Sequence, residues 1–299
     1  MTTFGQMAEE VSRKLAGFTL RQDRQTHLTS NISATATTIP IQSAQNVSVG
    51  IIQIGDELIY VDSFDRNANT LSVPPYGRGY NGTPAASHSL GDRVIISPTF
   101  PMLDIKNAIN ETILASFPTL YVVDSHEFPY RPARTTYPLP DDARRVLSAA
   151  WQTIGPSKEW QPVRAYRIDN MASTTAFNTN NTISIYSGVV PGRTVLVHYT
   201  APPSVMESST DNFSVTTGLP DSCKDVIIFG AQARLVSDVD PGRLTFGSAE
   251  ADQQSQIAGR AYNAGASSSK YLLALYQQRL EEEGRKLDEM HPIRIHYSK

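Results

Sequence analysis

Two hydrophobic periodicities alternate along this 299-residue chain. Apolar residues recur at helical spacing near the N-terminus, near residue 105 and from residue 218 onward. Between these segments they alternate with polar residues at period two, which is typical of strands with one buried face. The pattern therefore predicts an α+β fold in which a helical scaffold (N-terminal, central and C-terminal helices) is interrupted by two inserted antiparallel β modules.

The predicted scaffold has three helical parts. Residues 3–17 carry apolar side chains on one helical face, and a second helix begins near Leu103 and ends before Pro118, because the position before proline disfavours helical backbone. Residues 218–290 contain the remaining helices, and Pro292 ends the last one. Short helices are marginally stable alone. We therefore expect their apolar faces to be covered by one another or by a partner.

The two β modules fill the spaces between these helices. Five short alternating segments, separated by turns rich in Gly, Asp and Asn, predict a small antiparallel sheet or partly closed barrel. A second, larger sheet is predicted further on, where residues 182–186 and 194–199 alternate cleanly on either side of a Pro-Gly turn. The predicted order is residues 1–31 as N-terminal helix and lead-in, 32–98 as small β module, 99–119 as central helix, 120–217 as second β domain, 218–290 as C-terminal helices and 291–299 as extended tail.

Composition narrows the functional classes. A charged fraction of 18% and a net charge of −3 argue against non-specific binding to nucleic acid or an anionic membrane as the main role. The single Cys223 excludes an intramolecular disulfide and any Cys-based zinc cluster. No run approaches the ~20 apolar residues of a membrane span, and the first residues lack a secretory pattern. We expect a soluble, intracellularly made protein.

One glycine-rich motif, GRGYNG at residues 77–82, matches the pattern of dinucleotide-binding loops. Such a site needs a strand before it and a helix after it, so that the helix N-terminus faces the pyrophosphate. Here Thr83 and Pro84 follow, and another predicted strand begins shortly after Gly91, which leaves no room for a crossover helix. We interpret the motif as a β loop and expect no cofactor.

Three pairs of polar residues resemble metal ligands or acid–base pairs, namely His126 with Glu127, Asp141 with Asp142, and His291 with His296. Adjacent strand residues point to opposite faces, and Asp in a turn commonly binds its own backbone. The terminal pair has no carboxylate or Cys beside it in sequence. No G-x-S-x-G motif is present. We expect no metal site, no catalytic residue and no enzymatic activity.

The last residues, 291–299, form a basic and alternating strip. Ile293, Ile295 and Tyr297 would share one face of an extended segment, with Arg294 on the other. Three large apolar side chains at period two suit a strand added to the sheet edge of a partner, because such docking buries them and satisfies the backbone. The sequence therefore favours a docking tail, with a frayed basic terminus as the alternative.

Three segments carry a resemblance to a known family. Residues 55–94 contain GDELIYV, RGYNGT and GDRV in that order, and look like a small β module recurrent in phage virion proteins. Residues 137–203 form the next stretch, and residues 226–243 with residues 271–280 are similar to a helical core. Together they resemble head-to-tail adaptor (connector or neck) proteins of long-tailed bacteriophages, over most of the chain and by layout more than by any single motif.

The resemblance implies a non-enzymatic structural protein of the virion neck, at the head–tail interface. Members form a homo-oligomeric ring, usually a dodecamer, that binds the portal protein above and a head-closure (stopper) or tail protein below. The ring extends the channel through which double-stranded DNA leaves, with no sequence-specific binding and no membrane. A near-neutral chain suits such a conduit, since a strongly basic lumen would hold the genome.

The resemblance also implies roles for individual residues. The residues implied in ring contacts between subunits are Phe229, Ala233, Val236, Leu272, Leu275, Tyr276 and Leu280. Those implied in portal docking are Ile293, Arg294, Ile295 and Tyr297.

An alternative of another class is a phage tail or host-recognition protein whose β modules bind glycans. Trp151, Trp160 or the loop at residues 172–181 would then contact the sugar. Aromatic residues in sheets more often fill the core or pair across strands, which makes this the weaker interpretation. An enzyme with an unrecognised site is a third and still weaker one.

Overall fold

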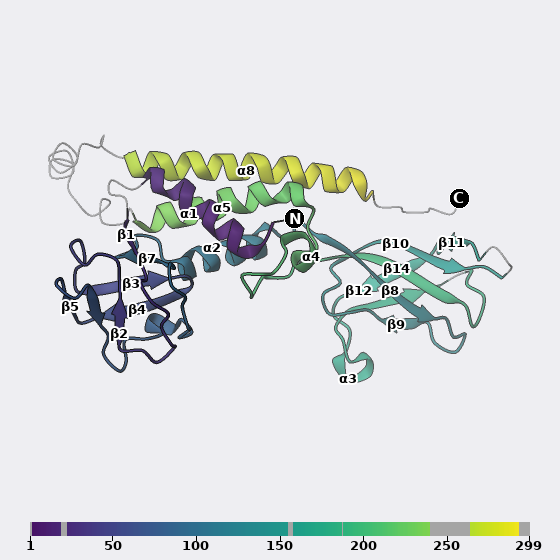
Figure 1. Ribbon diagram of the computed structural model, residues 1–299. Helices are drawn as coiled ribbons and strands as arrows, with labels where there is room; N and C mark the ends of the chain where they lie inside the picture. Colours follow the sequence, from purple (N-terminus) through teal and green to yellow (C-terminus); the bar gives the residue numbers. More distant parts are fainter. Residues whose placement is uncertain (1, 19–22, 155–157, 187, 240–263, 293–299) are drawn as a thin grey trace.

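The computed structural model of the chain describes residues 2–18, 23–154, 158–186, 188–239 and 264–292. Within these ranges it forms six α-helices and fourteen strands, which pair into four antiparallel sheets (Figure 1). The predicted fold class is therefore wrong: the chain is mostly β, and it is not a helical scaffold with two inserted β modules. The reason is that each β segment folds into two sheets around its own hydrophobic core, so strands build two of the three cores.

The first β unit contains a four-stranded and a three-stranded sheet. The first sheet has the order β1 (Arg24–His27), β7 (Arg93–Ile96), β3 (Gly50–Ile54), β4 (Glu57–Val61), and the second has the order β2 (Thr38–Pro40), β6 (Thr70–Ser72), β5 (Ser63–Asp65). Alternate side chains such as Ile52, Ile54 and Leu71 are fully buried between them. The sequence had assigned β1 to the N-terminal lead-in. It was missed because its only buried side chain, Thr26, is polar and gives no hydrophobic period.

The second β unit also contains two sheets. Its larger sheet has the order β11 (Trp160–Pro162), β10 (Arg145–Gln152), β14 (Thr194–Ala201), β8 (Val122–Pro129), and its smaller sheet has the order β12 (Tyr166–Asp169), β13 (Thr182–Ile185), β9 (Thr136–Pro138). The sequence placed residues 182–186 and 194–199 in one sheet, which is wrong. β13 and β14 lie in different sheets, and Val189, which comes between them in the sequence, is buried in the core of this unit.

The helices form a layer that joins the two β units (Figure 1). They are α1 (Phe4–Leu15), α2 (Met102–Ser116), α4 (Phe213–Thr217), α5 (Lys224–Val239) and α8 (Ala264–Met290), while the short α3 (Thr174–Phe177) lies in the second β unit. Short 3-10 turns η1 (Ala16–Phe18), η2 (Tyr80–Gly82) and η3 (Asp221–Cys223) complete the described helical elements. The helices bury one continuous core that includes Phe4, Ile109 and Ile227. Among the described residues, no helix combines the length and the apolar composition that a membrane span requires.

α1 shows how local sequence sets a helix boundary. Thr3 precedes the helix with extended backbone, and its hydroxyl accepts a hydrogen bond from the Gln6 N–H at 3.3 Å. The Thr3 N–H donates in turn to Gln6 Oε1 at 3.1 Å. This reciprocal capping box satisfies two N–H groups that the first turn leaves unpaired. The helix then buries Met7, Val11 and Leu15 completely, as the 3–17 periodicity predicts.

A polar contact holds the first β unit against the helices. Lys106 Nζ, on α2, lies 2.6 Å from Asp56 Oδ2 at the β3–β4 turn and 2.5 Å from the Ser209 hydroxyl. The Ser209 hydroxyl also donates to Asp56 at 2.8 Å. Three segments that are distant in sequence therefore meet at one ammonium group.

Candidate assembly interface

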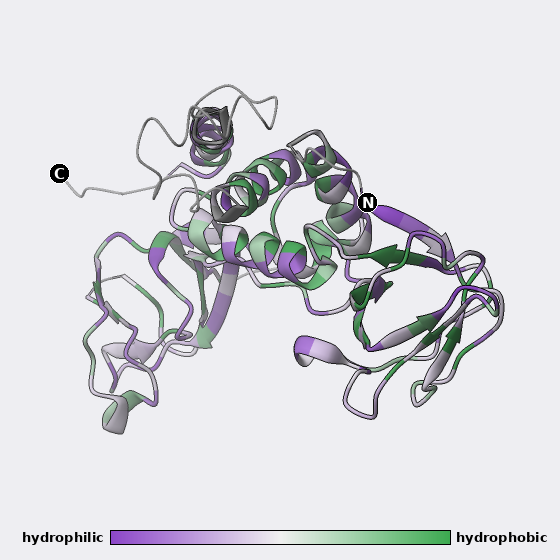
Figure 2. Cartoon of the chain, turned by 90° about the vertical axis from the view of Figure 1, so that its left-hand side faces the viewer, coloured by the Kyte–Doolittle hydropathy of each residue, from purple (hydrophilic) through white to green (hydrophobic). Residues whose placement is uncertain are grey.

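α8 packs along α5 at the rim of the helical layer, and Figure 2, in which α8 is seen nearly end-on, shows only one of its sides facing the rest of the chain. The close approach depends on Gly230 of α5. A Cβ atom at this position would lie 2.3 Å from Thr112 Cγ2 and 2.9 Å from the Tyr276 ring. α2, α5 and α8 therefore meet at a point where no side chain fits.

Most of the ring-contact residues implied by the resemblance pack against the helical core of the chain itself. Ala233, Val236 and Leu272 are buried in the core of the chain itself, at 5–6% exposure. Tyr276 and Leu280 are half-buried against that core. In this conformation the five residues stabilise the subunit.

The other two implied contacts retain accessible surface. Leu275 is half-buried on α8. Phe229 is half-buried on α5, with Lys14 Nζ 5.4 Å from its ring centroid. Both side chains therefore remain partly accessible at the surface of the chain.

The outer flanks of α8 remain apolar and exposed. Tyr271, at 64% exposure, lies one turn before Leu275 on one flank. Leu273, at 46% exposure, lies two turns before Leu280 on the other flank. A helix that packs on one side and keeps large apolar side chains on both flanks has surface to offer to a second protein.

A buried carboxylate fixes α8 against the start of α5. Glu283 is 2% exposed and accepts hydrogen bonds from the Ser222 hydroxyl at 2.8 Å, Lys286 at 2.7 Å and Arg279 at 3.1 Å. Burial acts to raise its pKa, but the hydrogen bonds from Lys286 and Ser222 outweigh burial and hold the pKa below its ordinary value. The bond from Ser222 links α8 to η3, the turn that precedes α5, whereas Arg279 and Lys286 lie on α8 itself.

The end of α8 meets the second β unit beside a tyrosine. The Tyr121 hydroxyl donates to Asp288 at 3.1 Å. Burial, followed by this hydrogen bond to a carboxylate, raises the pKa of Tyr121 to about 12. The phenol therefore remains a hydrogen-bond donor at any physiological pH.

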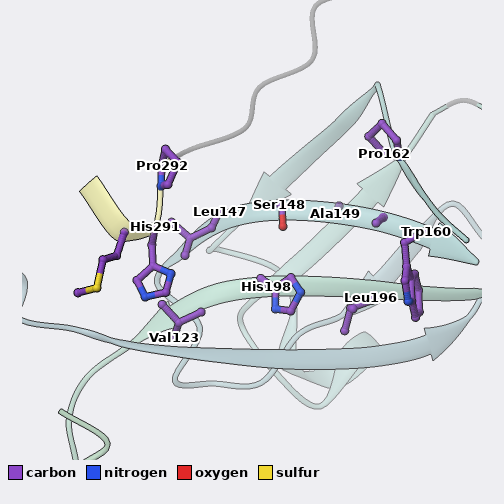
Figure 3. A pocket seen from close by; sticks show the side chains of 12 residues that line it. Val123, Leu147, Ser148, Ala149, Trp160, Pro162, Leu196, His198, His291 and Pro292 are labelled. Atoms are coloured by element: carbon purple, nitrogen blue, oxygen red, sulfur yellow. The ribbon is translucent and has the colours of Figure 1, made fainter. Parts of the chain in front are cut away.

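A groove of about 620 Å³ opens where α8 ends, between the helix terminus and the outer face of the β11-β10-β14-β8 sheet (Figure 3). The residues that line it are Val123, Leu147, Ser148, Ala149, Ala150, Trp160, Pro162, Leu196, His198, Met290, His291 and Pro292. Along β14, Val195 and Val197 are buried in the core. Leu196 and His198 alternate with them, so they point to the opposite face of the sheet and line the groove. Apolar side chains therefore line most of an open surface.

The predicted portal-docking residues Ile293, Arg294, Ile295 and Tyr297 lie outside the described residues. The chain is described as far as Pro292, which lines the groove together with His291. The segment that follows thus starts at the groove itself.

The glycine-rich motif surrounds a buried ion pair. Glu57 has no exposed side-chain surface, and Arg78 donates to both of its oxygens at 2.8 and 2.9 Å. His88 Nε2 lies 2.8 Å from the same carboxylate, and the N–H groups of Gly79 and Ala86 donate to it at 3.0 and 3.1 Å. The motif is therefore a loop wrapped around a carboxylate, and the N–H groups of Gly77 and Gly79 are used internally.

Electrostatics confirm that this cluster is satisfied. Burial opposes ionisation of Glu57, but the hydrogen bonds from Arg78, Ala86, His88 and Gly79 together lower its pKa to about 2. Arg78 further donates to the carbonyl oxygens of three loop residues. A carboxylate with this many donors is stabilised in its charged form and is a poor proton acceptor.

The other residues weighed as chemical groups are dispersed. Among the described residues no group of three His, Cys, Asp or Glu side chains is placed to hold a metal ion. Cys223 is buried, and burial raises the pKa of its thiol to about 11, so it is not a ready nucleophile. His291 lies at the groove, and its partner in the sequence motif, His296, is outside the described residues.

The two tryptophans do not form one platform. In the β10–β11 ladder Trp151 pairs with Gln161, and Trp160 pairs with Gln152. Neighbouring positions on a strand point to opposite faces, so Trp151 packs against the core and Trp160, 42% exposed, lies on the groove side. A sugar could stack on Trp160 but not on both rings.

Sequence reasoning missed the partners of Glu57 and the groove. A signal for the first existed, because Glu57, Arg78 and His88 all lie within the stretch that carries the resemblance. The groove had a weaker signal in the alternation along β14. No local pattern could indicate that the end of α8 lies over that sheet.

No protein-family model matches the chain, and no curated protein matches it.

Proposed function

We propose that the chain is a non-enzymatic structural protein of a bacteriophage virion. Copies of it form a head-to-tail adaptor ring that binds the portal, extends the DNA channel and meets a head-closure or tail protein below. A closed ring requires each subunit to present two different surfaces, one to each neighbour. The proposal concerns such a subunit and involves no chemical step.

The observation that carries the proposal is the pair of apolar flanks on α8. Tyr271 and Leu275 lie on one side, and Leu273 on the other, of a helix whose inner side is already packed. Two distinct flanks suit the heterologous contacts of a ring, because each neighbour covers a different one. Burial of apolar surface contributes about 25 cal/mol per Å², so a few such side chains per contact are enough when many contacts act together.

The polar chemistry of the described residues also supports a structural role. Among the described residues, Glu57 and Glu283 are the carboxylates that accept the most hydrogen bonds. These bonds hold a loop and a helix in place. Neither is free to accept a proton from a substrate. A rigid subunit with defined flanks is what repeated assembly needs.

The test combines the purified protein with its portal protein and uses electron microscopy. Wild-type chain should form rings that stack on the portal. A chain cut after Met290 should remain folded by circular dichroism but should fail to stack, because the predicted docking tail is gone. Normal stacking by the truncated chain would contradict the role of the tail.

Variants of α8 test ring closure separately. Tyr271→Ser with Leu273→Ser should leave the subunit folded and monomeric, since both residues are exposed. The matched control is Val49→Ser with Leu90→Ser, which removes two apolar residues of similar exposure, 52% and 65%, from the first β unit. If the α8 variant closes into rings as well as the control does, the flanks are not the subunit contact.

A further inference from the structure

The groove in Figure 3 begins at the last described residue and continues across the sheet. Pro292 stands at one end of it and Trp160, on β11, at the other. Seven residues, 293–299, follow Pro292 in the chain. An extended segment of that length spans up to about 25 Å, whereas two steps between neighbouring strands, from β14 to β11, cover about 10 Å. The segment is therefore long enough to cross the groove.

The groove and this segment match in polarity. The groove presents Leu196, Ala150 and Pro162, with Trp160 beyond them. Ile293, Ile295 and Tyr297 fall on one face of the segment when it is extended. The segment therefore carries a face of three large apolar side chains, and it begins directly after Pro292, which lines the open apolar groove.

We propose that, in the free subunit, residues 293–299 of the same chain occupy this groove. Ile293, Ile295 and Tyr297 contact the sheet, and Arg294 lies on the opposite face of the segment. The tail is thereby kept on its own subunit until a partner of higher affinity draws it out. Occupancy of the groove does not depend on the proposed function, whereas its use in controlling access to the portal rests on it.

Tethering makes even a weak contact sufficient. A segment joined directly to its site has an effective concentration of about 1 mM, so a Kd of about 0.1 mM for the free peptide would give about 90% occupancy. The same tail can leave readily when a ring of partners offers many sites at once. The groove thus needs no exceptional affinity to hold the tail.

Trp160 provides the readout, because it lines the groove and is 42% exposed in the described residues. We compare acrylamide quenching of tryptophan fluorescence in the full chain and in a chain cut after Pro292, both as dilute free subunits. At about 90% occupancy, the fraction of Trp160 open to the quencher should be about tenfold lower in the full chain. The difference should vanish in Trp160→Phe, which leaves Trp151 as the only fluorescent indole.

Matched variants separate docking from folding. Full-length chain with Ile293→Ser and Ile295→Ser should behave like the truncated chain, and so should Leu196→Asp. Leu90→Ser, on the first β unit, should behave like wild type. A synthetic peptide of residues 293–299, added to the truncated chain at millimolar concentration, should restore protection and so rule out misfolding.

Three results would overturn the inference. Equal quenching in the full and truncated chains would mean that the groove is open. Protection that grows with protein concentration would assign the groove to the tail of a second copy. Protection that occurs only after portal is added would assign it to the portal. Every quenching measurement made before portal is added uses the free subunit. Tail docking can therefore be disproved while rings still form, and ring formation can fail while the tail still docks.

Discussion

Arg78 clamps Glu57 through two parallel hydrogen bonds, from Nε to Oε1 at 2.8 Å and from Nη2 to Oε2 at 2.9 Å. The pair joins β4 to the glycine-rich loop, and neither side chain exposes more than 8% of its surface. Bidentate pairing of this kind needs the planar fork of arginine. The stretch GDELIYV…RGYNGT thus encodes one internal clamp.

Removing the arginine should unfold the first β unit more easily. In Arg78→Ala the carboxylate of Glu57 stays buried without its main partner, which costs about 3–5 kcal/mol. Urea unfolding followed by hydrogen exchange of the β3 and β4 amides measures the loss. The control is Arg66→Ala, an exposed arginine over the Phe64 ring, which should change stability by less than about 1 kcal/mol. Equal losses in the two variants would contradict the clamp.

The same carboxylate predicts a pH dependence. The pKa of Glu57 is lower in the folded chain, at about 2, than its ordinary value of 4.5. The stability it contributes is therefore fully present above pH 4.5 and is lost as the pH falls toward 2. Glu57→Gln should be less stable at neutral pH, and its stability should fall less steeply than that of wild type between pH 4.5 and 2. Parallel curves of unfolding free energy against pH would exclude this role, since other carboxylates titrate in both proteins.

The sequence predicted where most strands lie better than it predicted which strands pair with one another. Strands β3, β4 and β14 all lie in segments that the sequence assigned to strands. β14 alternates between buried and partly exposed positions, whereas β3 and β4 carry short runs of consecutive apolar residues that are mostly buried. β1 and β5 escaped notice, since Thr26 is the only buried residue of β1 and Phe64 is only half-buried in β5. Periodicity also says nothing about which strands pair, so four sheets were predicted as two. The fold class was wrong for that reason.

The candidate interface was predictable only in part. Helical spacing marked Leu272 and Leu280 as one apolar side of α8, but it could not tell whether α5 or another subunit covers that side. The groove depends on the end of α8 lying near β14, which is a contact between segments far apart in sequence. Long-range contacts of this kind leave no local pattern.

The neighbours Glu282 and Glu283 should respond differently to the same change. Glu283 is buried and accepts three hydrogen bonds, whereas Glu282 is partly exposed and pairs with Arg279 on the surface. Glu283→Gln should lower the free energy of unfolding by about 1–3 kcal/mol, because it weakens charge-assisted hydrogen bonds in a buried site. Glu282→Gln should have no measurable effect. Thermal unfolding of the two variants side by side measures the difference, and a larger loss in Glu282→Gln would refute the assignment.

Replacing Gly230 by alanine should destabilise the chain, although the same change stabilises most helix interiors. Replacing a mid-helix glycine by alanine ordinarily gains up to about 1 kcal/mol. Here the added methyl group would meet Thr112 at 2.3 Å and Tyr276 at 2.9 Å, and overpacking of this kind costs about 1–3 kcal/mol. Gly230→Ala should therefore lower the free energy of unfolding by about 1–2 kcal/mol in urea denaturation, by forcing α8 away from α5.

A matched control for Gly230 comes from Gly17, where no atom lies within 4 Å of an added Cβ. Gly17→Ala should leave stability unchanged or slightly raised, since it adds no clash and removes freedom from the unfolded chain. The double variant Gly230→Ala with Thr112→Ser removes the nearest obstructing methyl group and should recover part of the loss. A stabilising effect of Gly230→Ala alone would mean that α2, α5 and α8 are packed less closely than the distances require.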